Sequence, residues 1–396
     1  MKIGYAQTAI TPCLDKPVFL AGFGNNRRAE TIHDDLYARA LAIEDGSTTL
    51  VLAALDLLGF IRADVNDVIQ EVHKTHPNAQ VIIASIHTHH APDTLGLWGP
   101  DRMTNGVDGE YLSATKDKIA STILASLSYL QKATIRSTSV HIPGLVKNTR
   151  NPEILDDELT VVQFLAADGK PAATLFNFPC HPEVLWEHNP HITADYVAPL
   201  RQEVEKQTGA ACIFFAGALG GMLTPDVKDH SFAEAEFMGR KLAQEGLKAI
   251  GAASIDPAPT SSIQRKEIKA RLTNILYKMA FEQKLLQDVR DPEGFATSEV
   301  NLIKLGGLWL ATVPGELLPK LGLQLKAWMK TAGAQVASVI GLANDELGYM
   351  LPAEDFKYPS NPFNPGKHYE ETNSIGKDIA PKVMDALSEI IHGRAS

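Results

Sequence analysis

Three histidines within four residues are the strongest candidates for chemistry in this 396-residue chain. His87, His89 and His90 belong to the stretch Ile-His-Thr-His-His-Ala-Pro at residues 86–92. Alternate side chains of extended backbone point the same way, so His87 and His89 can share a face. Neutral imidazole is the commonest protein metal ligand near pH 7. A polar loop with chance histidines is the alternative, but three of the thirteen directly after an apolar run favour a metal site.

Three other groups far along the chain also follow apolar, strand-like runs. They are His181 in Asn-Phe-Pro-Cys-His-Pro, Glu316 after Val-Pro-Gly, and Tyr349 in the polar stretch 343–350. Each has a bland interpretation: a satisfied loop histidine, a carboxylate favouring a helix N-terminus, and a packed tyrosine. Three polar residues close to His181 in the sequence strengthen its case: His188, His191 and Asp195.

Together these groups suggest a particular chemistry. Two histidines and a carboxylate form a known catalytic zinc set, with a further position left for water. Zinc lowers the pKa of that water to about 7, so a nucleophile becomes available at neutral pH. We therefore predict a hydrolase that uses Zn²⁺ and no organic cofactor. One metal or two remains open.

The elements that must position these groups follow from hydrophobic patterning. Residues 80–86 form an apolar, β-branched run typical of a buried strand, and the histidine run begins at its end. Before it come a hairpin of 38–45 and 49–56 around Gly46 and Ser47, and an amphipathic helix around 65–72. Ligands bind at the carboxyl ends of strands in open α/β sheets. The histidine run at the end of the predicted strand therefore lies where a ligand-binding site is expected.

The rest of the chain continues this mixed pattern, with a glycine-rich segment at 217–225 and a candidate linker at 252–262. We predict one α/β domain over residues 1–396, built from mixed β-sheets with flanking helices, with an internal connection at the linker. The remaining predicted strands are 133–142, 158–166, 171–179, 211–215, 296–305, 308–313 and 336–341, and the remaining helices are 109–131, 195–207, 231–249, 316–330 and 376–391.

Composition excludes several classes of protein. A net charge of −10 argues against a nucleic-acid binder and against docking on anionic lipid. No run approaches 18 apolar residues and no secretory signal is recognisable, so we expect no membrane span. Three widely spaced cysteines fit a reducing compartment, and the expected location is cytoplasmic. The oligomeric state is left open, a homo-oligomer included.

Several motifs, taken in order, resemble the catalytic domain of the neutral, non-lysosomal ceramidases and their shorter bacterial relatives. The opening residues 3–12 look like the family's N-terminal strand and Ile-Thr-Pro turn. Gly22-Phe-Gly24, the segment 33–40 and Asp56 follow in family order. The most specific match is His-Thr-His-His-Ala-Pro at 87–92, against the family's His-Thr-His-Ser-Gly-Pro. The resemblance covers nearly all of residues 1–392.

The resemblance implies roles for individual residues. His89 would line the substrate pocket, Arg150 in Asn-Thr-Arg would contact the substrate, and Tyr369 would hydrogen-bond the scissile group. The implied zinc ligands are His87, His181, Glu316 and Tyr349.

The chain departs from the family in two ways. Ceramidases carry Gly-Asp-Val-Ser-Pro with a catalytic serine, whereas this chain reads Gly-Gly-Met-Leu-Thr-Pro with Thr224 in the nearest place. The acid is missing and the spacing is one residue longer, so activated water is a better nucleophile than a hydroxyl. The chain also lacks the large C-terminal sandwich domain and a long apolar lip. A smaller, soluble amide is therefore expected in place of ceramide.

The expected mechanism is attack of water on an amide carbonyl. His89 or Asp195 would handle the proton, and Arg150 and Tyr369 would stabilise the developing charge. A zinc esterase or lactonase with the same site is an alternative, as is a paralogue that binds a ligand without turnover. A metal phosphatase would need more carboxylates near the histidines. The paired strands at 38–56 and 158–179 argue against an amidohydrolase barrel.

Overall fold

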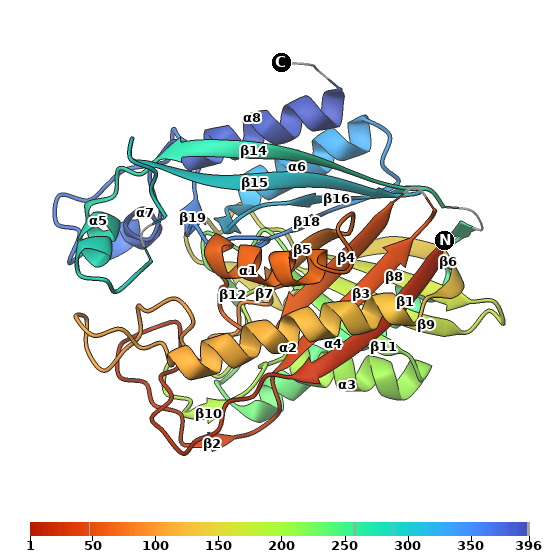
Figure 1. The fold of residues 1–396 in the computed structure, drawn as a ribbon, viewed down its shortest axis with the longest axis horizontal. Helices are drawn as coiled ribbons and strands as arrows, with labels where there is room; N and C mark the ends of the chain where they lie inside the picture. Colours follow the sequence, from red (N-terminus) through yellow and green to blue (C-terminus); the bar gives the residue numbers. More distant parts are fainter. Residues whose placement is uncertain (47, 257–258, 288, 394–396) are drawn as a thin grey trace.

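A large mixed β-sheet is the main element of the computed structural model, which describes residues 1–46, 48–256, 259–287 and 289–393 (Figure 1). Its strands follow the order β11-β9-β8-β6-β1-β3-β4-β5, and β13 pairs with β6 beside this path. Among the described strands of this sheet, β4 with β5 and β9 with β11 run parallel, and the other pairs run antiparallel. The strands are β1 (Lys2–Ala9), β3 (Tyr37–Glu44), β4 (Thr49–Leu55), β5 (Gln80–Ser85), β6 (Gln131–His141), β8 (Glu158–Ala166), β9 (Pro171–Phe178), β11 (Ala211–Ala216) and β13 (Ile255–Asp256).

Both predicted hairpins are present in this sheet. Strands β3 and β4 pair antiparallel, as do β8 and β9. Gly46 lies in the first turn, whereas Ser47 lies outside the described residues. The antiparallel pairs separate this fold from a regular parallel barrel, as the sequence predicted.

Four helices flank the main sheet: α1 (Arg62–His73), α2 (Gly109–Ser128), α3 (Val197–Thr208) and α4 (Phe232–Gly251). Helix α2 packs on β1 and β3, α4 packs on β6 and β8, and α3 packs on β11 and α4. Two of these helices begin at a capping side chain, Asp108 for α2 and Ser231 for α4, each of which accepts backbone N–H bonds of the first turn.

A second sheet lies between the main sheet and two further helices, α6 (Pro319–Thr331) and α8 (Ile379–His392) (Figure 1). Its strands are β14 (Ser261–Arg271), β15 (Phe295–Leu305), β16 (Leu308–Thr312) and β18 (Val336–Ile340). Side chains alternate between its faces. Ile303 and Leu310 join the core of the main sheet, whereas Leu302 and Ala311 join a core with α6 and α8. Mixed sheets with flanking helices were the predicted fold class, and they are confirmed.

The candidate linker at 252–262 joins α4 to the second sheet and contains short strand segments. Residues 255–256 form β13 on the main sheet, and β14 begins at Ser261, while 257–258 lie outside the described residues. Strand β14 escaped prediction because its sequence is dominated by charged residues. Lysine and arginine suit the edge of a sheet, where β14 lies, because they discourage pairing with another chain.

The predicted helix at 316–330 begins three residues late, and the reason matters for the site. Proline disfavours helical backbone in the residue before it, so Leu318 is extended and α6 begins at Pro319. The freed residues form the short strand β17 (Glu316–Leu317), which pairs parallel with β19 (Tyr349–Met350). The pairing sets Glu316 directly opposite Tyr349.

The loop before β19 is fixed to the edge of the main sheet by Asn344. Its amide oxygen accepts from the backbone N–H of Ile83 at 2.7 Å, and its backbone N–H donates to the carbonyl of Ile83 at 2.7 Å. These two hydrogen bonds join Asn344 to the outer edge of β5, one through its side chain and one through its backbone. This contact brings the chain around Tyr349 close to the end of β5, where the histidine run begins.

Short elements complete the fold, and several gather with the loops at the left of Figure 1. They are β2 (Thr31–Ile32) paired with β10 (His191–Ile192), β7 (Val146–Asn148) paired with β12 (Leu223–Pro225), and the helices α5 (Ile275–Glu282), α7 (Tyr369–Thr372) and η1 (Gly366–His368).

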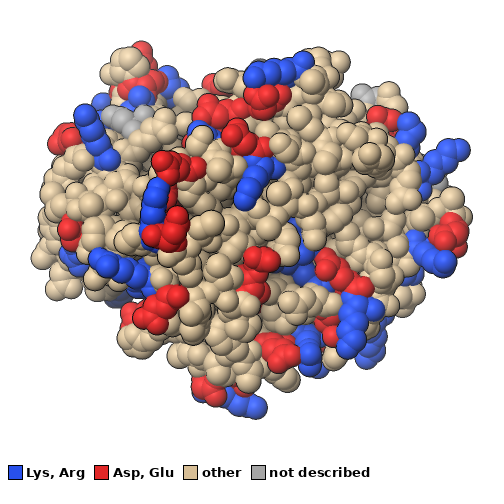
Figure 2. Space-filling view, turned by 60° about the horizontal axis from the view of Figure 1, so that its bottom comes forward, with Lys and Arg blue, Asp and Glu red and all other residues tan. Residues whose placement is uncertain are grey.

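Two surface properties bear on partners. Within the described ranges no helix is both long and apolar enough to cross a bilayer. On the face shown in Figure 2, acidic and basic side chains are interspersed and do not gather into a broad basic patch.

Candidate metal centre

His87 leaves the end of β5 in an unusual backbone conformation. Its φ is +70°, which is uncommon for a residue other than glycine. Its backbone N–H donates to the carbonyl of Leu57 at 3.0 Å, and its ring Nδ1 donates to the carbonyl of Leu58 at 2.7 Å. Because a carbonyl can only accept, Nδ1 carries the proton and Nε2 keeps a free lone pair. Metal-binding histidines are oriented in this way.

His181 follows β9 and is held in the same manner. Its backbone N–H and its ring Nδ1 both donate to the carbonyl of Leu223, each at 2.9 Å. Leu223 belongs to β12, so a different part of the sequence fixes this ring. Nε2 of His181 points the other way, toward Oε2 of Glu316 at 3.1 Å.

The rings of His87, His89 and His181 form one buried cluster. One nitrogen from each lies within 4.8 Å of the others, a spacing that could hold a metal ion. Ring centroids are 5.0 to 5.5 Å apart. Neither ring nitrogen of His89 has a hydrogen-bond partner among the described residues. Buried imidazole nitrogens without partners are costly unless a ligand, a water or an ion satisfies them, so His89 faces a place where a further group can bind.

Glu316 brings a carboxylate to this cluster. Its Oε2 lies 3.1 Å from Nε2 of His181 and 3.6 Å from Nε2 of His87. Tyr349, its neighbour across the β17–β19 pair, adds a buried phenol. The two strands approach closely because Gly315 has no side chain: a Cβ there would lie 2.5 Å from the carbonyl oxygen of Gly348.

The charges of the cluster are strongly perturbed by burial and by one another. Burial lowers the pKa of His87 to about 4, so this ring is neutral at pH 7. Burial would also lower the pKa of His181, but the carboxylates of Glu183 and Glu316 raise it to about 9. For Glu316, His87 and His181 outweigh burial and lower the pKa. Two buried carboxylates thus draw positive charge to this point, which a bound cation would also supply.

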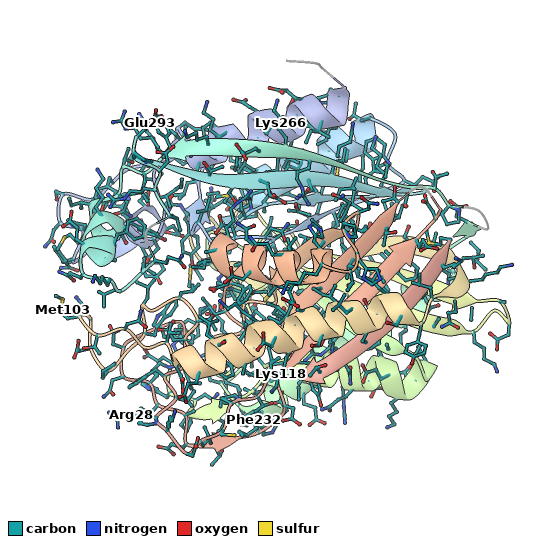
Figure 3. The ribbon with its side chains drawn as sticks, in the orientation of Figure 1. Arg28, Met103, Lys118, Phe232, Lys266 and Glu293 are labelled. Carbon is teal, nitrogen blue, oxygen red and sulfur yellow. The ribbon has the colours of Figure 1, made fainter. Side chains whose placement is uncertain are left out.

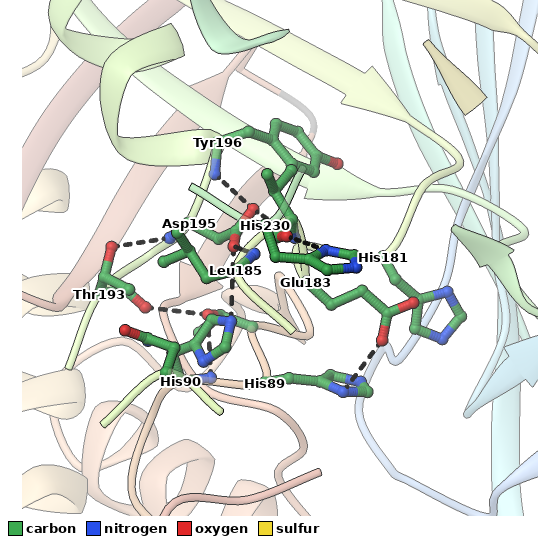
Figure 4. A network of polar contacts seen from close by, with 12 residues as sticks. His89, His90, His181, Glu183, Leu185, Thr193, Asp195, Tyr196 and His230 are labelled. Carbon is green, nitrogen blue, oxygen red and sulfur yellow. Dashed lines mark hydrogen bonds and ion pairs between the residues drawn. The ribbon is translucent and has the colours of Figure 1, made fainter. Parts of the chain in front are cut away.

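Glu183 is a component of the centre that the sequence reading missed. Its side chain is completely buried, and its Oε2 lies 3.2 Å from Nδ1 of His89 without the geometry of a hydrogen bond (Figure 4). Burial raises the pKa of its carboxyl. A sequence signal was present, because Glu183 follows the candidate ligand His181 by two residues.

A narrow pocket of about 80 Å³ opens onto His87, His89, Glu316 and Tyr349. Tyr369 lines the same pocket, with its ring centroid 6.0 Å from that of Tyr349. The rest of the lining is mostly apolar and includes Leu58, Leu95, Trp98, Tyr277, Phe281 and Leu347. The pocket is therefore a small and largely apolar space beside the histidines.

Asp195 lies away from His89. Its carboxylate accepts backbone N–H bonds from Val184, Leu185 and Tyr196 at 2.7 to 3.1 Å (Figure 4). Its Oδ2 lies 3.5 Å from Nε2 of His90, which is also completely buried. These contacts brace the loop that carries His181 and Glu183, and do not place Asp195 on the pocket.

Arg150 lies next to the pocket but not in its lining. Its guanidinium donates to Glu370 at 2.7 Å and to Glu371 at 2.9 and 3.1 Å. Those acids directly follow Tyr369 in α7. Arg150 is therefore placed to fix the segment that presents Tyr369.

Thr224 and the glycine-rich segment before it contribute to the backbone packing around the site. Thr224 lies in β12 opposite Lys147, and its hydroxyl is close enough to Glu183 to lower the pKa of that carboxyl, although burial prevails. A Cβ on Gly220 would lie 2.5 Å from the carbonyl oxygen of Glu316. The close approach that the glycines permit is thus to the backbone of β17.

Comparisons with known proteins place this geometry in context. Residues 1–229 match the family profile described as neutral/alkaline non-lysosomal ceramidase, N-terminal. A solved ceramidase complexed with C2 is 16% identical and superimposes with a TM-score of 0.80, covering 98% of this chain and 74% of its own. The neutral ceramidase from Pseudomonas aeruginosa is 17% identical and superimposes with a TM-score of 0.78. This match covers 99% of this chain and 74% of the ceramidase chain. No curated protein matches the sequence.

Proposed function

Because the chain belongs to the neutral/alkaline non-lysosomal ceramidase family, we propose that it is a zinc-dependent hydrolase that cleaves the carbon–nitrogen bond of a small amide. The observation that carries the proposal is the buried convergence of His87, His181 and Glu316, with Nε2–Oε2 distances of 3.6 and 3.1 Å. The small volume of the adjoining pocket, about 80 Å³, supports an acyl group shorter than that of a ceramide.

His87, His181, Glu316 and Tyr349 would hold the metal. When bound there, zinc supplies Lewis acidity and makes water available as a nucleophile at neutral pH. Two imidazoles, a carboxylate and a phenol are donors that suit zinc better than a hard cation, which prefers oxygen ligands alone. The backbone carbonyls of Leu58 and Leu223 hold both imidazoles in the tautomer that presents Nε2.

We assign proton transfer to His89, supported by Glu183. Burial lowers the pKa of His89 well below its usual value, so the ring is neutral at pH 7 and can accept a proton. The carboxylate of Glu183, 3.2 Å from Nδ1, would orient the ring and stabilise its protonated form. Asp195, the other residue considered for this step, is occupied by backbone N–H groups and by His90.

Tyr369 is the group best placed to stabilise charge on the substrate. It lines the pocket beside Tyr349, and its hydroxyl can donate to a carbonyl oxygen that gains negative charge. Arg150 acts through Tyr369 as a positioning residue, since its bonds to Glu370 and Glu371 fix the start of α7. Thr224 takes no nucleophilic role in this scheme.

The test is hydrolysis of a matched panel of short-chain amides and their ester counterparts by the purified protein, before and after chelation. We expect amide cleavage that chelation abolishes and that zinc restores. Cleavage of esters alone would replace the amidase by an esterase or lactonase with the same site. Full amide activity in metal-free protein would refute the proposal, and metal binding without any turnover would leave a binding paralogue.

A further inference from the structure

A second cavity adjoins the pocket, and it has no role in the scheme above. It measures about 480 Å³, against about 80 Å³ for the pocket. Tyr369 lines both spaces. Met222 also lines the cavity, and its sulfur accepts a hydrogen bond of 3.3 Å from the hydroxyl of Tyr349. The cavity therefore begins at the two tyrosines that face the candidate metal centre.

The two spaces differ in chemistry. Apolar and aromatic side chains dominate the lining of the pocket. The cavity is lined by the polar segment 148–151, by residues 318–320 at the start of α6, and by charged residues within 352–357 and 366–370. A molecule that occupied both spaces would have one small apolar part and one larger part that meets charged and polar side chains among apolar ones.

The acidic side chains that line the cavity all form ion pairs. Glu354 and Asp355 both pair with Lys320, at 2.8 and 3.3 Å, and Glu370 pairs with Arg150 at 2.7 Å. Every carboxylate of the lining thus already has a cationic partner.

Two cationic groups of the cavity, the ammonium groups of Lys357 and Lys367, have no such partner among the described residues. Among the described residues neither of them makes a hydrogen bond or an ion pair, and both residues belong to the lining of the cavity. The charges left for a ligand are therefore positive, and a carboxylate would meet two groups with three donors each.

We propose that this cavity binds the hydrophilic, negatively charged half of the substrate, with Lys357 and Lys367 as the residues that determine specificity. The substrate class is then a short N-acyl conjugate of an amino acid, whose apolar acyl group enters the pocket. The inference rests on the proposed amide hydrolysis for the position of the scissile bond between the two spaces. It goes beyond that function because a ceramide has no such charge.

The test uses non-cleavable ligands, so that binding is measured apart from turnover. Ketone analogues of N-hexanoyl glycine, β-alanine and 4-aminobutanoate, with CH₂ in place of the amide N–H, are compared with their neutral carboxamides. Calorimetric titration of the protein as purified gives both affinities. For at least one chain length we expect the carboxylate to bind about fivefold to tenfold more tightly than its carboxamide, and this preference to shrink as ionic strength rises from about 0.05 M to about 0.5 M.

Two variants locate the effect. The double variant Lys357→Gln/Lys367→Gln should lose the preference for the carboxylate and bind the carboxamide as the wild type does. Lys118→Gln, on the exposed face of α2 (Figure 3) and outside the lining of the cavity, should keep the preference. Equal affinity for carboxylate and carboxamide at every chain length would overturn the inference, as would a preference that survives in the double variant.

Hydrolysis of the parent amides keeps the two proposals distinguishable. A carboxylate preference in binding without any hydrolysis would refute the proposed function and leave the cavity as an anion-binding site. Hydrolysis without a carboxylate preference would support the proposed function and overturn the assignment of the cavity.

Discussion

Replacing Glu183 with glutamine removes a negative charge 3.2 Å from Nδ1 of His89 and keeps the shape of a completely buried side chain. If Glu183 stabilises protonated His89 during the reaction, kcat should fall about 100- to 1,000-fold, a loss of about 3–4 kcal/mol of transition-state stabilisation. The zinc content should not change, because Glu183 is not among the proposed ligands.

The same substitution should not destabilise the fold, and the sign follows from the pKa. Burial raises the pKa of the Glu183 carboxyl above the 4.5 of an exposed glutamate. The folded state therefore binds more protons than the unfolded state, and this group's contribution to stability falls as pH rises from about 4.5 through the raised pKa. Glutamine stays neutral, so at pH 7 the variant's Tm should equal or exceed that of the wild type at matched zinc content.

The assay combines steady-state kinetics on a cleavable amide, thermal unfolding at several pH values, and metal analysis. Glu187→Gln is the matched control, because it removes a half-exposed carboxylate four residues along the chain and should leave all three measurements unchanged. Unchanged kcat in Glu183→Gln would refute the proposed pairing with His89. A loss of activity that tracks a fall in Tm would show a structural role instead.

Three other substitutions test further parts of the account. Gly22→Ala should lower kcat at least about tenfold in steady-state assays, since its Cβ would lie 2.6 Å from the ring of His89 at a φ of +79°, whereas Gly24→Ala meets nothing within 4 Å and should be silent. Tyr369→Phe should lower kcat about 10- to 100-fold without changing the Tm, and equal rates would remove Tyr369 from the mechanism. Arg201→Met should cost about 3–5 kcal/mol in denaturant unfolding, because both guanidinium bonds of 2.7 Å to the buried Asp56 are lost, and a change below about 1 kcal/mol would contradict this reasoning.

The sequence predicted the fold class and most long elements because their signals are local. Buried strands such as β5 read as apolar runs, and both hairpins read as paired strands around turn residues. Strand β14 and the short pair β17–β19 carry no such signal. The partners of β14 lie 24 to 44 residues away in the sequence, and those of β17 lie 33 residues away. Pro319 also delays the start of α6 beyond Glu316, where the sequence predicted a helix.

The candidate site was predicted where residue type and strand position agreed. His87, His181, Glu316 and Tyr349 each follow a strand-like run in the sequence, and the structure brings them together. Glu183 was missed because a carboxylate after a histidine and a proline is common. Its proximity to His89 depends on how two distant loops pack. The hydrogen bonds that Asp195 accepts from backbone N–H groups could likewise not be predicted from the sequence, because they depend on how its loop folds.

The most direct test of the central claim is the metal content of the purified protein and of ligand variants, measured by elemental analysis. We expect one zinc per chain, lost in His181→Ala and in Glu316→Gln but retained in the control His33→Ala, whose histidine is half exposed and remote in the sequence. Fully active protein without bound metal, or undiminished zinc in both ligand variants, would contradict it.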